Sequence, residues 1–306
     1  MIDRKFDLLV AGEINPDLVL SGNVLPEFGQ VEKIVDSAVL SIGSSSAIFA
    51  CGAARLGLRV AFIGKCGDDH FGRFMLEEMQ KRQVDVENVI VEKGGNTGLT
   101  VILASGSDRA ILTSLGLIPS LRADELSDSL LRQSHHLHIA SYFLQESLRP
   151  GLPALFGRAH SLGLTTSLDT NYDPRGRWLG FDELLSVTNL FFPNETEAKS
   201  LTHETTITDA ANALRNKTEI VAIKLGAQGA LGISGAQTVQ VESIPVTVAD
   251  TVGAGDSFAA GFIYAYLQKW ELKKSLRLAC VCGALSTRSP GGTTSQPTLE
   301  EALHYV

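Results

Sequence analysis

The sequence predicts an α/β fold in which helices cover a mostly parallel sheet and a second, smaller sheet projects from the main body. Short apolar runs that suit buried strands alternate with helical patterns along most of the chain, which indicates crossover units and a parallel sheet. Residues 32–42 and 98–114 differ, because β-branched and apolar residues mix there with polar ones and are interrupted by glycine and aspartate. This composition is typical of a half-exposed sheet, so we expect the two segments to pair as a small projecting sheet.

The first predicted strand is residues 6–11, an apolar run that ends at Gly12 and leads into a loop with Asn15 and Asp17. Further strands are expected at 59–63, 137–142, 165–169, 190–192, 220–224 and 230–233, and helices at 71–83, 152–162 and 253–270. Ligands of parallel sheets bind outside the carboxyl ends of the strands. Polar or glycine pairs follow three of the predicted strands, and we expect one cleft to contain them: Asp169 with Asn171, Asn194 with Glu197, and Gly226 with Gly229.

The size and composition of the chain exclude several classes of protein. Its 306 residues suit one large domain or two ordinary ones, and the balance of charged and hydrophobic residues is ordinary for a globular protein. A net charge of −8 with no basic stripe argues against nucleic acid as a partner. No apolar stretch approaches the roughly 20 residues of a membrane span, and residues 1–7 lack the apolar region of a signal peptide. We therefore expect no membrane contact and a cytoplasmic location.

The segment that begins at Gly253 predicts a phosphate site at the start of a helix. Small residues at a helix N-terminus let backbone N–H groups approach an anion, and the helix dipole favours negative charge there. Asp256 lies inside this first turn, where its carboxylate would repel a bound phosphate. One explanation is that Asp256 accepts the proton of an attacking hydroxyl. The alternative is that its charge only complements the helix dipole, which stabilises by about 0.3–1 kcal/mol.

The run from Asp250 to Ile263 resembles the second signature of the ribokinase-like (PfkB) carbohydrate kinase family, and further motifs occur in that family's order across nearly the whole chain. The resemblance implies a ribokinase-like three-layer sandwich with a small β-sheet lid, and an ATP-dependent kinase activity. It also implies that Gly253, Ala254 and Gly255 form an anion hole for the transferred phosphoryl group and that Asp256 is the catalytic base.

Two further motifs concern the nucleotide. Asn194 and Glu197 resemble the family's Asn-x-x-Glu motif, which implies that they organise magnesium-bound water; alone, the pair is equally a helix N-cap with its capping-box glutamate. Gly226 and Gly229 resemble the family's Gly-x-x-Gly turn beside ATP; alone, they form a hairpin between two strands. Lys224 is placed either to reach a phosphate or to be exposed at the end of its strand.

The substrate end of the resemblance is less complete. Asn15 and Asp17 resemble the family's first strand and loop, in which the aspartate binds substrate hydroxyls; the alternative is an Asx-turn. The first family signature aligns Gly43 and Ser44 with its two glycines and Ile48 with its substrate-binding asparagine. Ile48 has no hydrogen-bonding side chain, which leaves the identity of the substrate open. The serines around Ser44 either supply hydroxyls in compensation or cap the following helix.

Other candidate contacts lie further along the chain. Asn171 belongs to a segment that resembles the family's Asp-x-Asn-x-Arg stretch, with Asp173 in place of the arginine and with Arg175 and Arg177 close enough in sequence to replace it. Arg109 lies in a segment that resembles the part of the family's lid before the second projecting strand. Its side chain either contacts the substrate or lies in solvent. A cluster of three histidines consists of His135, His136 and His138. Alternation along a strand places His136 and His138 on one face, as in some zinc sites, but no acidic or thiol partner has fitting spacing. We therefore favour a cluster at a strand entry over a metal site.

We therefore expect a single kinase domain over residues 1–306, with lid segments at about 13–42 and 96–116, that transfers the γ-phosphoryl group of ATP to a hydroxyl of a sugar or sugar-like molecule. Mg²⁺ is the expected cofactor, and a monovalent cation, which parts of the family use, is left open. The exposed lid sheet favours a homodimer. Two alternatives remain open: a nucleoside kinase of the same family, and a catalytically silent relative that binds a sugar or nucleoside.

Overall fold

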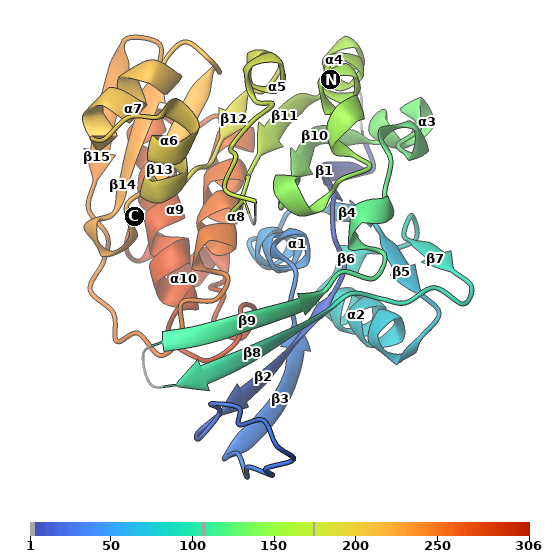
Figure 1. The fold of residues 1–306 in the computed structure, drawn as a ribbon. Helices are drawn as coiled ribbons and strands as arrows, with labels where there is room; N and C mark the ends of the chain where they lie inside the picture. Colours follow the sequence, from blue (N-terminus) through green and yellow to red (C-terminus); the bar gives the residue numbers. More distant parts are fainter. Residues whose placement is uncertain (1–3, 106–107, 174) are drawn as a thin grey trace.

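A sheet of nine strands forms the centre of the part of the chain that the computed structural model describes, residues 4–105, 108–173 and 175–306 (Figure 1). The order across the sheet is β15-β14-β13-β12-β11-β10-β1-β4-β6. Strands from β13 to β6 pair in parallel, whereas β14 and β15 form an antiparallel edge. The strands are β1 Phe6–Ala11, β4 Val60–Ile63, β6 Val84–Asp85, β10 Ser134–Ile139, β11 Thr165–Leu168, β12 Leu190–Phe191, β13 Ile220–Lys224, β14 Ala230–Ser234 and β15 Gln237–Val241.

Strand β1 lies between β10 and β4 and is buried on both faces. Successive side chains of a strand point to opposite faces. Leu8 and Val10 accordingly belong to one hydrophobic cluster, and Leu9 and Ala11 belong to the other. A strand with a core on each side needs apolar residues at nearly every position, which is why Asp7 is the one polar residue in β1.

Helices form the two outer layers of the sandwich. One cluster of buried residues joins the sheet to α1, α2, α8, α9 and α10, and the other joins it to α3, α4, α5, α6 and α7. The three-layer α/β prediction is therefore confirmed. The helices are α1 Ser45–Arg55, α2 His70–Lys81, α3 Asp128–Leu131, α4 Leu152–Ser161, α5 Asp182–Ser186, α6 Glu195–Thr202, α7 Ile207–Leu214, α8 Ala254–Leu267, α9 Leu272–Ser286 and α10 Leu299–Leu303.

A four-stranded sheet, called the lid below, projects from the main body (Figure 1). It consists of β2 Pro16–Ser21, β3 Ser37–Ile42, β8 Leu99–Ser105 and β9 Asp108–Ser114, in the order β3-β2-β8-β9. The small projecting sheet is confirmed, but direct pairing of residues 32–42 with 98–114 is wrong, because β2 lies between β3 and β8. The sequence interpretation places a loop around Asn15 and Asp17, whereas Asp17 pairs with Ser41 and Thr100 as a strand residue.

A short parallel pair, β5 Lys65–Gly67 with β7 Ile90–Glu92, lies beside the lid. Strand β10 ends at Ile139, earlier than the predicted residue 142, because Ser141 adopts a left-handed conformation with φ 50°. In the described part of the chain, no helix combines the length and the apolar character that crossing a bilayer requires.

Candidate active site

The start of α8 provides an open backbone surface beside the sheet. Gly253 caps the helix with φ 73°, a conformation that strongly favours glycine. An added Cβ at Gly253 would lie 2.8 Å from both Gly292 Cα and Ile48 Cγ2, so no other residue fits there. At Gly255 the nearest atoms to an added Cβ belong to the Lys224 side chain, with Nζ at 3.4 Å, and this residue lines a cavity. These two glycines keep the first turn of α8 accessible to a ligand.

The first N–H groups of a helix have no partner inside the helix. The Ala254 N–H donates to the Thr251 carbonyl over 3.3 Å, a long hydrogen bond. No acceptor is found for the N–H groups of Gly255 and Asp256 among the described residues. The N–H groups that are free to bind an anion are thus those of Gly255 and Asp256, at the end of the predicted anion hole that lies inside the helix. The helix dipole favours an anion there.

Asp256 is buried inside this first turn. Burial raises the pKa of its carboxyl group well above the usual range, and the Asp169 carboxylate raises it further, while Lys224 and a hydrogen bond from Ser45 oppose the shift. A carboxylate with a raised pKa is a stronger base than an exposed aspartate. This environment suits proton transfer better than it suits a helix-end charge, which would gain nothing from burial.

Lys224 forms an ion pair within this group of carboxylates. Its Nζ lies 2.7 Å from Asp169 Oδ2, and the two side chains are only 14% and 2% exposed. Burial disfavours the ammonium, but the carboxylates of Asp169 and Glu197 outweigh burial, so the pKa of Lys224 is raised. Of the two positions that the sequence allows for Lys224, the exposed one is therefore wrong.

Asn194 and Glu197 form both halves of a capping box at the start of α6. The Asn194 side chain accepts from Glu197 N at 2.9 Å, and Glu197 Oε2 accepts from Asn194 N at 2.8 Å. The cap and the metal interpretation are compatible, because Glu197 Oε1 has no protein donor among the described residues. Burial raises the pKa of Glu197 to about 7, and a divalent cation would stabilise its charged form.

A cavity of about 620 Å³ lies against the N-terminal part of α8. The β13–β14 hairpin, residues 243–251, α8 and α9 line it, and its walls include Pro245, Val246, Phe258 and Ala284. Gly226 and Gly229 lie in the hairpin turn with positive φ, and an added Cβ at Gly229 would lie 1.9 Å from Val241 O. A cavity with apolar walls and phosphate-binding amides at one end fits a nucleotide.

The polar residues expected to contact the second substrate lie where the lid meets the main body. Asp17 is buried, and burial raises the pKa of its carboxyl group to about 7, while Arg109 opposes the shift. The Asn15 side chain donates to Thr100 Oγ1 over 3.1 Å and lies beside Asp17. Arg109 lies 3.6 Å from Asp250 Oδ1 at the end of the lid, so it faces the main body rather than open solvent.

The three serines at the start of α1 have different partners. Ser44 caps α1 by accepting from Ala47 N at 3.1 Å and donates to the Glu13 carbonyl at 2.6 Å, so the capping alternative holds for this residue. Ser45 instead faces the cleft, where it contacts Asn171 Nδ2 at 2.5 Å and Asp256. The alternative that these serines supply hydroxyls therefore holds for Ser45, and the pattern of three serines gave no means of telling them apart.

Asn171 joins this serine to the other side of the cleft. Its Nδ2 also donates to Ser141 Oγ at 2.9 Å, and Ser141 donates to Glu13 Oε1 at 2.7 Å. Glu13 accepts as well from the Ser46 hydroxyl at 2.6 Å and is buried. Glu13 and Ser141 therefore hold the segments that carry Asn171 and Asn15 at fixed positions. The sequence interpretation missed both residues.

The two departures from the family pattern have structural explanations. Ile48 packs against Gly253 and Gly292 and is 3% exposed, so it supports the start of α8. Asp173 accepts from the backbone N–H groups of Arg175 at 2.8 Å and Arg177 at 2.7 Å, and it organises its own loop.

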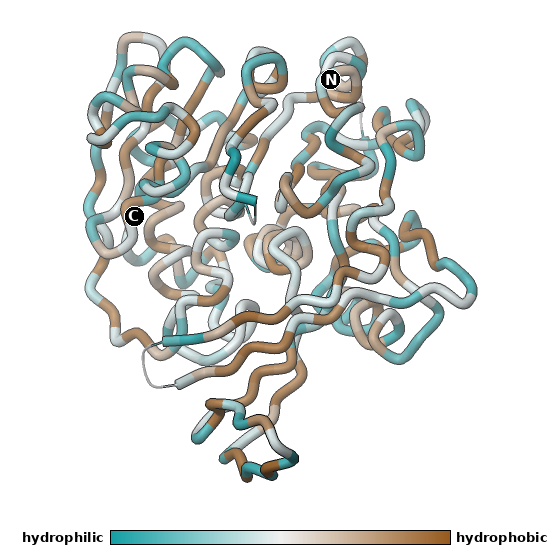
Figure 2. The backbone as a smooth tube through the Cα atoms, in the orientation of Figure 1, coloured by the Kyte–Doolittle hydropathy of each residue, from teal (hydrophilic) through white to brown (hydrophobic). Residues whose placement is uncertain are grey.

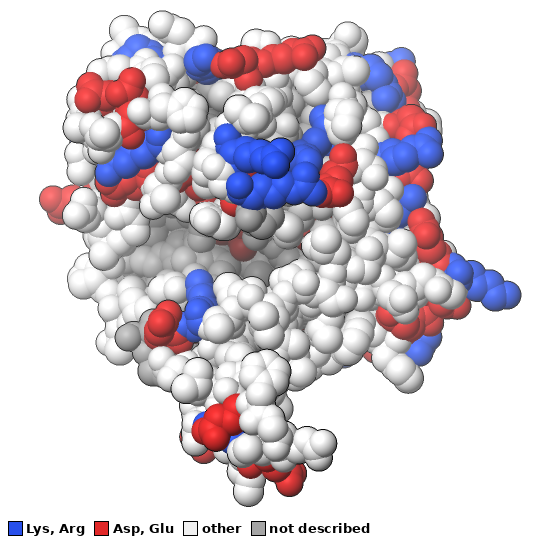
Figure 3. Space-filling model, in the orientation of Figure 1, with Lys and Arg blue, Asp and Glu red and all other residues white. Residues whose placement is uncertain are grey.

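Figure 3 shows a hollow between the lid and the main body. Basic side chains are gathered above this hollow, over the segment between β11 and α5, which contains Arg175 and Arg177.

The histidine pair is not arranged as a metal centre. Buried His136 and His138 both contact Ser167 Oγ at 2.7 Å, and His138 stacks on Phe49 with ring centroids 3.8 Å apart. Within the residues that the structure describes, no group of three or more His, Cys, Asp or Glu side chains has the geometry of a metal site. Their position inside the sheet, rather than at a strand entry, gives them a structural role.

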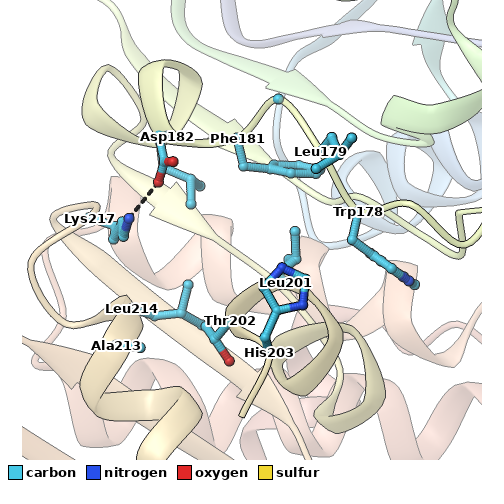
Figure 4. A pocket seen from close by; sticks show the side chains of 12 residues that line it. Trp178, Leu179, Phe181, Asp182, Leu201, Thr202, His203, Ala213, Leu214 and Lys217 are labelled. Carbon is cyan, nitrogen blue, oxygen red and sulfur yellow. Dashed lines mark hydrogen bonds and ion pairs between the residues drawn. The ribbon is translucent and has the colours of Figure 1, made fainter.

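A second cavity of about 320 Å³ lies apart from these residues, between the loop that carries Trp178, α5 and the helices α6 and α7 (Figure 4). Leu179, Phe181 and Leu214 form part of its wall, and an Asp182–Lys217 ion pair closes one side. None of the candidate site residues lines it. We therefore place the chemistry in the cleft and not in this cavity.

A buried carboxyl group in the first turn of a helix, beside a cavity of about 620 Å³ and a lid, is the arrangement expected of a phosphotransferase. A family model described as pfkB family carbohydrate kinase matches residues 6–299. An ATP-dependent ribose-1-phosphate kinase from Halopiger xanaduensis is 30% identical over 98% of this chain and 97% of that protein. A ribokinase from Haemophilus influenzae is 29% identical over 98% of each chain. The chain therefore belongs to the pfkB family of carbohydrate kinases, and it is an ATP-dependent sugar kinase.

The fold agrees with this family. A candidate ribokinase II from E. coli, solved in complex with ATP and Mg²⁺, superposes with a TM-score of 0.86, at 24% identity and with 98% of each chain covered. The residues of the present chain fit the same two ligands, because its cavity leads to the first turn of α8 and because the buried Glu197 carboxylate has one oxygen without a protein donor among the described residues.

Proposed function

We propose that the chain phosphorylates a hydroxyl of a sugar with Asp256 as the catalytic base. The observation that supports this role is the position of Asp256: a buried carboxyl group of raised pKa in the first turn of α8, between open N–H groups and the acceptor end of the cleft. Asp256 removes the hydroxyl proton as the hydroxyl oxygen attacks the γ-phosphorus, while the bond from this phosphorus to the β,γ-bridging oxygen breaks and ADP leaves. The amides of Gly253, Ala254 and Gly255 stabilise the charge that develops on the transferred phosphoryl group.

The nucleotide is proposed to lie in the larger cavity, with the Gly226–Gly229 turn against its base and ribose and its phosphates toward Gly255. Glu197 and Asn194 are the residues that would hold Mg²⁺ and its waters. When bound, Mg²⁺ offsets the charge of the triphosphate. Dependence on a monovalent cation stays a prediction, which turnover in K⁺, Na⁺ and tetramethylammonium salts at one ionic strength would test.

At the acceptor end, Asp17 and Asn15 are proposed to bind substrate hydroxyls, with Asn171 and Arg109 on either side of the cleft. Gly43 leaves room for the Asp17 carboxylate, and Ser44 contributes through its cap. A carboxylate accepts hydroxyl hydrogens in short, directional bonds. Closure of the lid would exclude water, which otherwise competes as the acceptor.

Among sugars, an acceptor with its own phosphate or carboxylate group fits the basic rim of the cleft best. Arg177 and Arg175, which pairs with Glu146, lie in the loop between β11 and α5, and the relative from Halopiger xanaduensis is named for an anionic sugar. A nucleoside acceptor has less support, because Ile48 and Phe49, which would have to form an apolar slot for its base, are buried against the main body.

The proposed function is tested by measuring ADP release with a panel of acceptors: ribose, fructose, ribose 1-phosphate, a 2-keto-3-deoxy sugar acid and adenosine. We expect turnover with at least one sugar and the highest kcat/KM with an anionic one. If no acceptor is turned over although binding of ATP and a sugar is measurable, the chain is a silent binder and the proposed function is wrong.

The lid is proposed to mediate a homodimer. Its edge strands β3 and β9 expose apolar side chains, with Val39 54%, Ile111 55% and Leu112 62% exposed. Figure 2 shows hydrophobic residues along the backbone of the projecting sheet. Unpaired edges and exposed apolar faces favour association. We expect sedimentation to give a dimer for the native chain and a monomer for Leu112→Glu, and a native monomer at micromolar concentration would contradict this.

A cytoplasmic location stays a prediction.

A further inference from the structure

The Lys224–Asp169 ion pair lies between the two substrate ends of the cleft. Lys224 is the last residue of β13, and its backbone N–H donates to the Pro193 carbonyl at 2.9 Å, which fixes the start of its side chain next to Asn194. Its Nζ lies 2.7 Å from Asp169 Oδ2 and 3.4 Å from the position of an added Cβ at Gly255. The ammonium is therefore already at the open turn of α8, where the phosphates are expected.

The same lysine lines the nucleotide cavity. Three carboxylates act on its charge, those of Asp169, Glu197 and Asp256, so the ammonium has three potential anionic partners. A buried ammonium keeps its charge only with close anionic partners. Asp169 and a phosphate oxygen would both be such partners, and they would compete for the same ammonium.

Asp169 is connected to the acceptor end as well. Its Oδ1 accepts from Asn171 N over 3.4 Å, and the Asn171 side chain contacts Ser45 and Ser141. A change in the partner of Asp169 would thus act on a residue that we place against the acceptor. The ion pair is the contact through which the nucleotide end and the acceptor end of this cleft are connected.

We propose that Lys224 is a phosphate-binding residue that Asp169 holds in the empty site and that exchanges Asp169 for a phosphate oxygen of ATP when the nucleotide binds. This proposal rests on the proposed placement of ATP. After the exchange, the Asp169 carboxylate lacks its cation and lies near Asp256, where its charge favours transfer of the acceptor proton to Asp256. Binding of ATP would in this way strengthen the base at the moment when it is needed.

The exchange predicts opposite effects for the two partners of the ion pair. Removing the ammonium removes a phosphate contact, so the affinity for a triphosphate falls. Removing the Asp169 charge removes both the competitor for the ammonium and a repulsive charge near the phosphates, so the affinity rises. A purely structural ion pair predicts a loss or no change for both substitutions.

Calorimetric titration with the ATP analogue AMP-PNP and with adenosine, at one fixed Mg²⁺ concentration, tests the proposal. We expect Lys224→Met to weaken AMP-PNP binding by about tenfold or more, the size of one charge-assisted contact, and to leave adenosine binding within about twofold. Asp169→Asn is expected to tighten AMP-PNP binding by about threefold or more, again without an effect on adenosine. Lys217→Met is the matched control, since Lys217 pairs with Asp182 outside the cleft (Figure 4).

Lys224→Met leaves Asp169 buried without a cation, so the double variant Asp169→Asn/Lys224→Met is measured beside it. Its affinity for AMP-PNP is expected to be about tenfold or more below that of Asp169→Asn. Equal or weaker AMP-PNP binding by Asp169→Asn, or equal losses for AMP-PNP and adenosine, would overturn the proposal. Because these titrations need neither an acceptor nor turnover, their outcome is independent of whether Asp256 is the base.

Discussion

The Asp17 carboxylate occupies the space that a side chain at residue 43 would fill: an added Cβ at Gly43 would lie 2.1 Å from Asp17 Oδ1. This contact connects the lid, which carries Asp17, to the segment that leads into α1. Gly43 has no positive φ, so its role is to leave room rather than to permit an unusual backbone conformation. The glycine of the first family motif is thus explained by the position of the Asp17 carboxylate, which we propose binds the substrate.

Gly43→Ala is expected to displace Asp17 and to lower kcat/KM for the acceptor by about 100-fold, since a shift of about 1 Å in a positioning group has an effect of this size. Binding of AMP-PNP should be unchanged. Gly157→Ala is the control, because Gly157 lies in α4 and an added Cβ there meets nothing within 4 Å. Steady-state kinetics of both variants checks this, and full activity of Gly43→Ala would remove Asp17 from the acceptor site.

Gly255→Ala is expected to stabilise the folded state and yet to lower the activity with ATP. Alanine in a helix is favoured over glycine by about 0.5–1 kcal/mol, and the nearest contact of the new Cβ is an ordinary one. The methyl group would, however, cover the open turn where the phosphates are expected. Thermal unfolding should show an unchanged or raised Tm, whereas kcat/KM for ATP should fall about tenfold or more. A variant with native kinetics would show that this turn is not the anion hole.

His136 is expected to lower stability in acid. Burial lowers the pKa of His136 to about 3, from an unfolded value near 6.5. Between these values the unfolded chain binds the proton and the folded chain does not, so the contribution is complete above pH 6.5 and is lost as the pH falls toward 3.

The carboxyl groups of Asp17 and Glu197 have raised pKa values, so they raise the unfolding free energy as the pH falls over part of this range. The pH dependence of the native chain alone therefore does not isolate the effect of His136. The measurement is therefore the difference in unfolding free energy between the native chain and His136→Gln. This difference should change by about 1.4 kcal/mol per pH unit below pH 6. A difference that does not vary with pH would contradict the buried neutral state of His136.

The fold was largely predictable from sequence because its determinants are local. Parallel strands such as β1 and β13 are mostly apolar, and Asp256 lies in a motif in which glycine spacing, helix start and acidic residue are adjacent. Strand β2 was missed because Asn15 and Pro16 have strong turn preferences, which pairing with β3 and β8 overrides.

The contacts between distant segments could not be predicted in this way. Lys224 is buried only because Asp169, 55 residues away, supplies its counter-charge. The difference between Ser44, which caps α1, and Ser45, which faces the cleft, depends on where Asn171 lies. Periodicity and composition contain no information about such pairs, and the acceptor remains the least determined part of the site for the same reason.

The most direct test of the account is the turnover and stability of Asp256→Asn, measured with ATP and the best acceptor of the panel at pH 8. Removing the base should lower kcat by about 100-fold to 10,000-fold. AMP-PNP binding should persist, and the unfolding free energy should rise, because a buried carboxyl group of raised pKa costs stability as the pH rises above its unfolded value. Native turnover by Asp256→Asn would contradict the assignment of the base and with it the proposed mechanism.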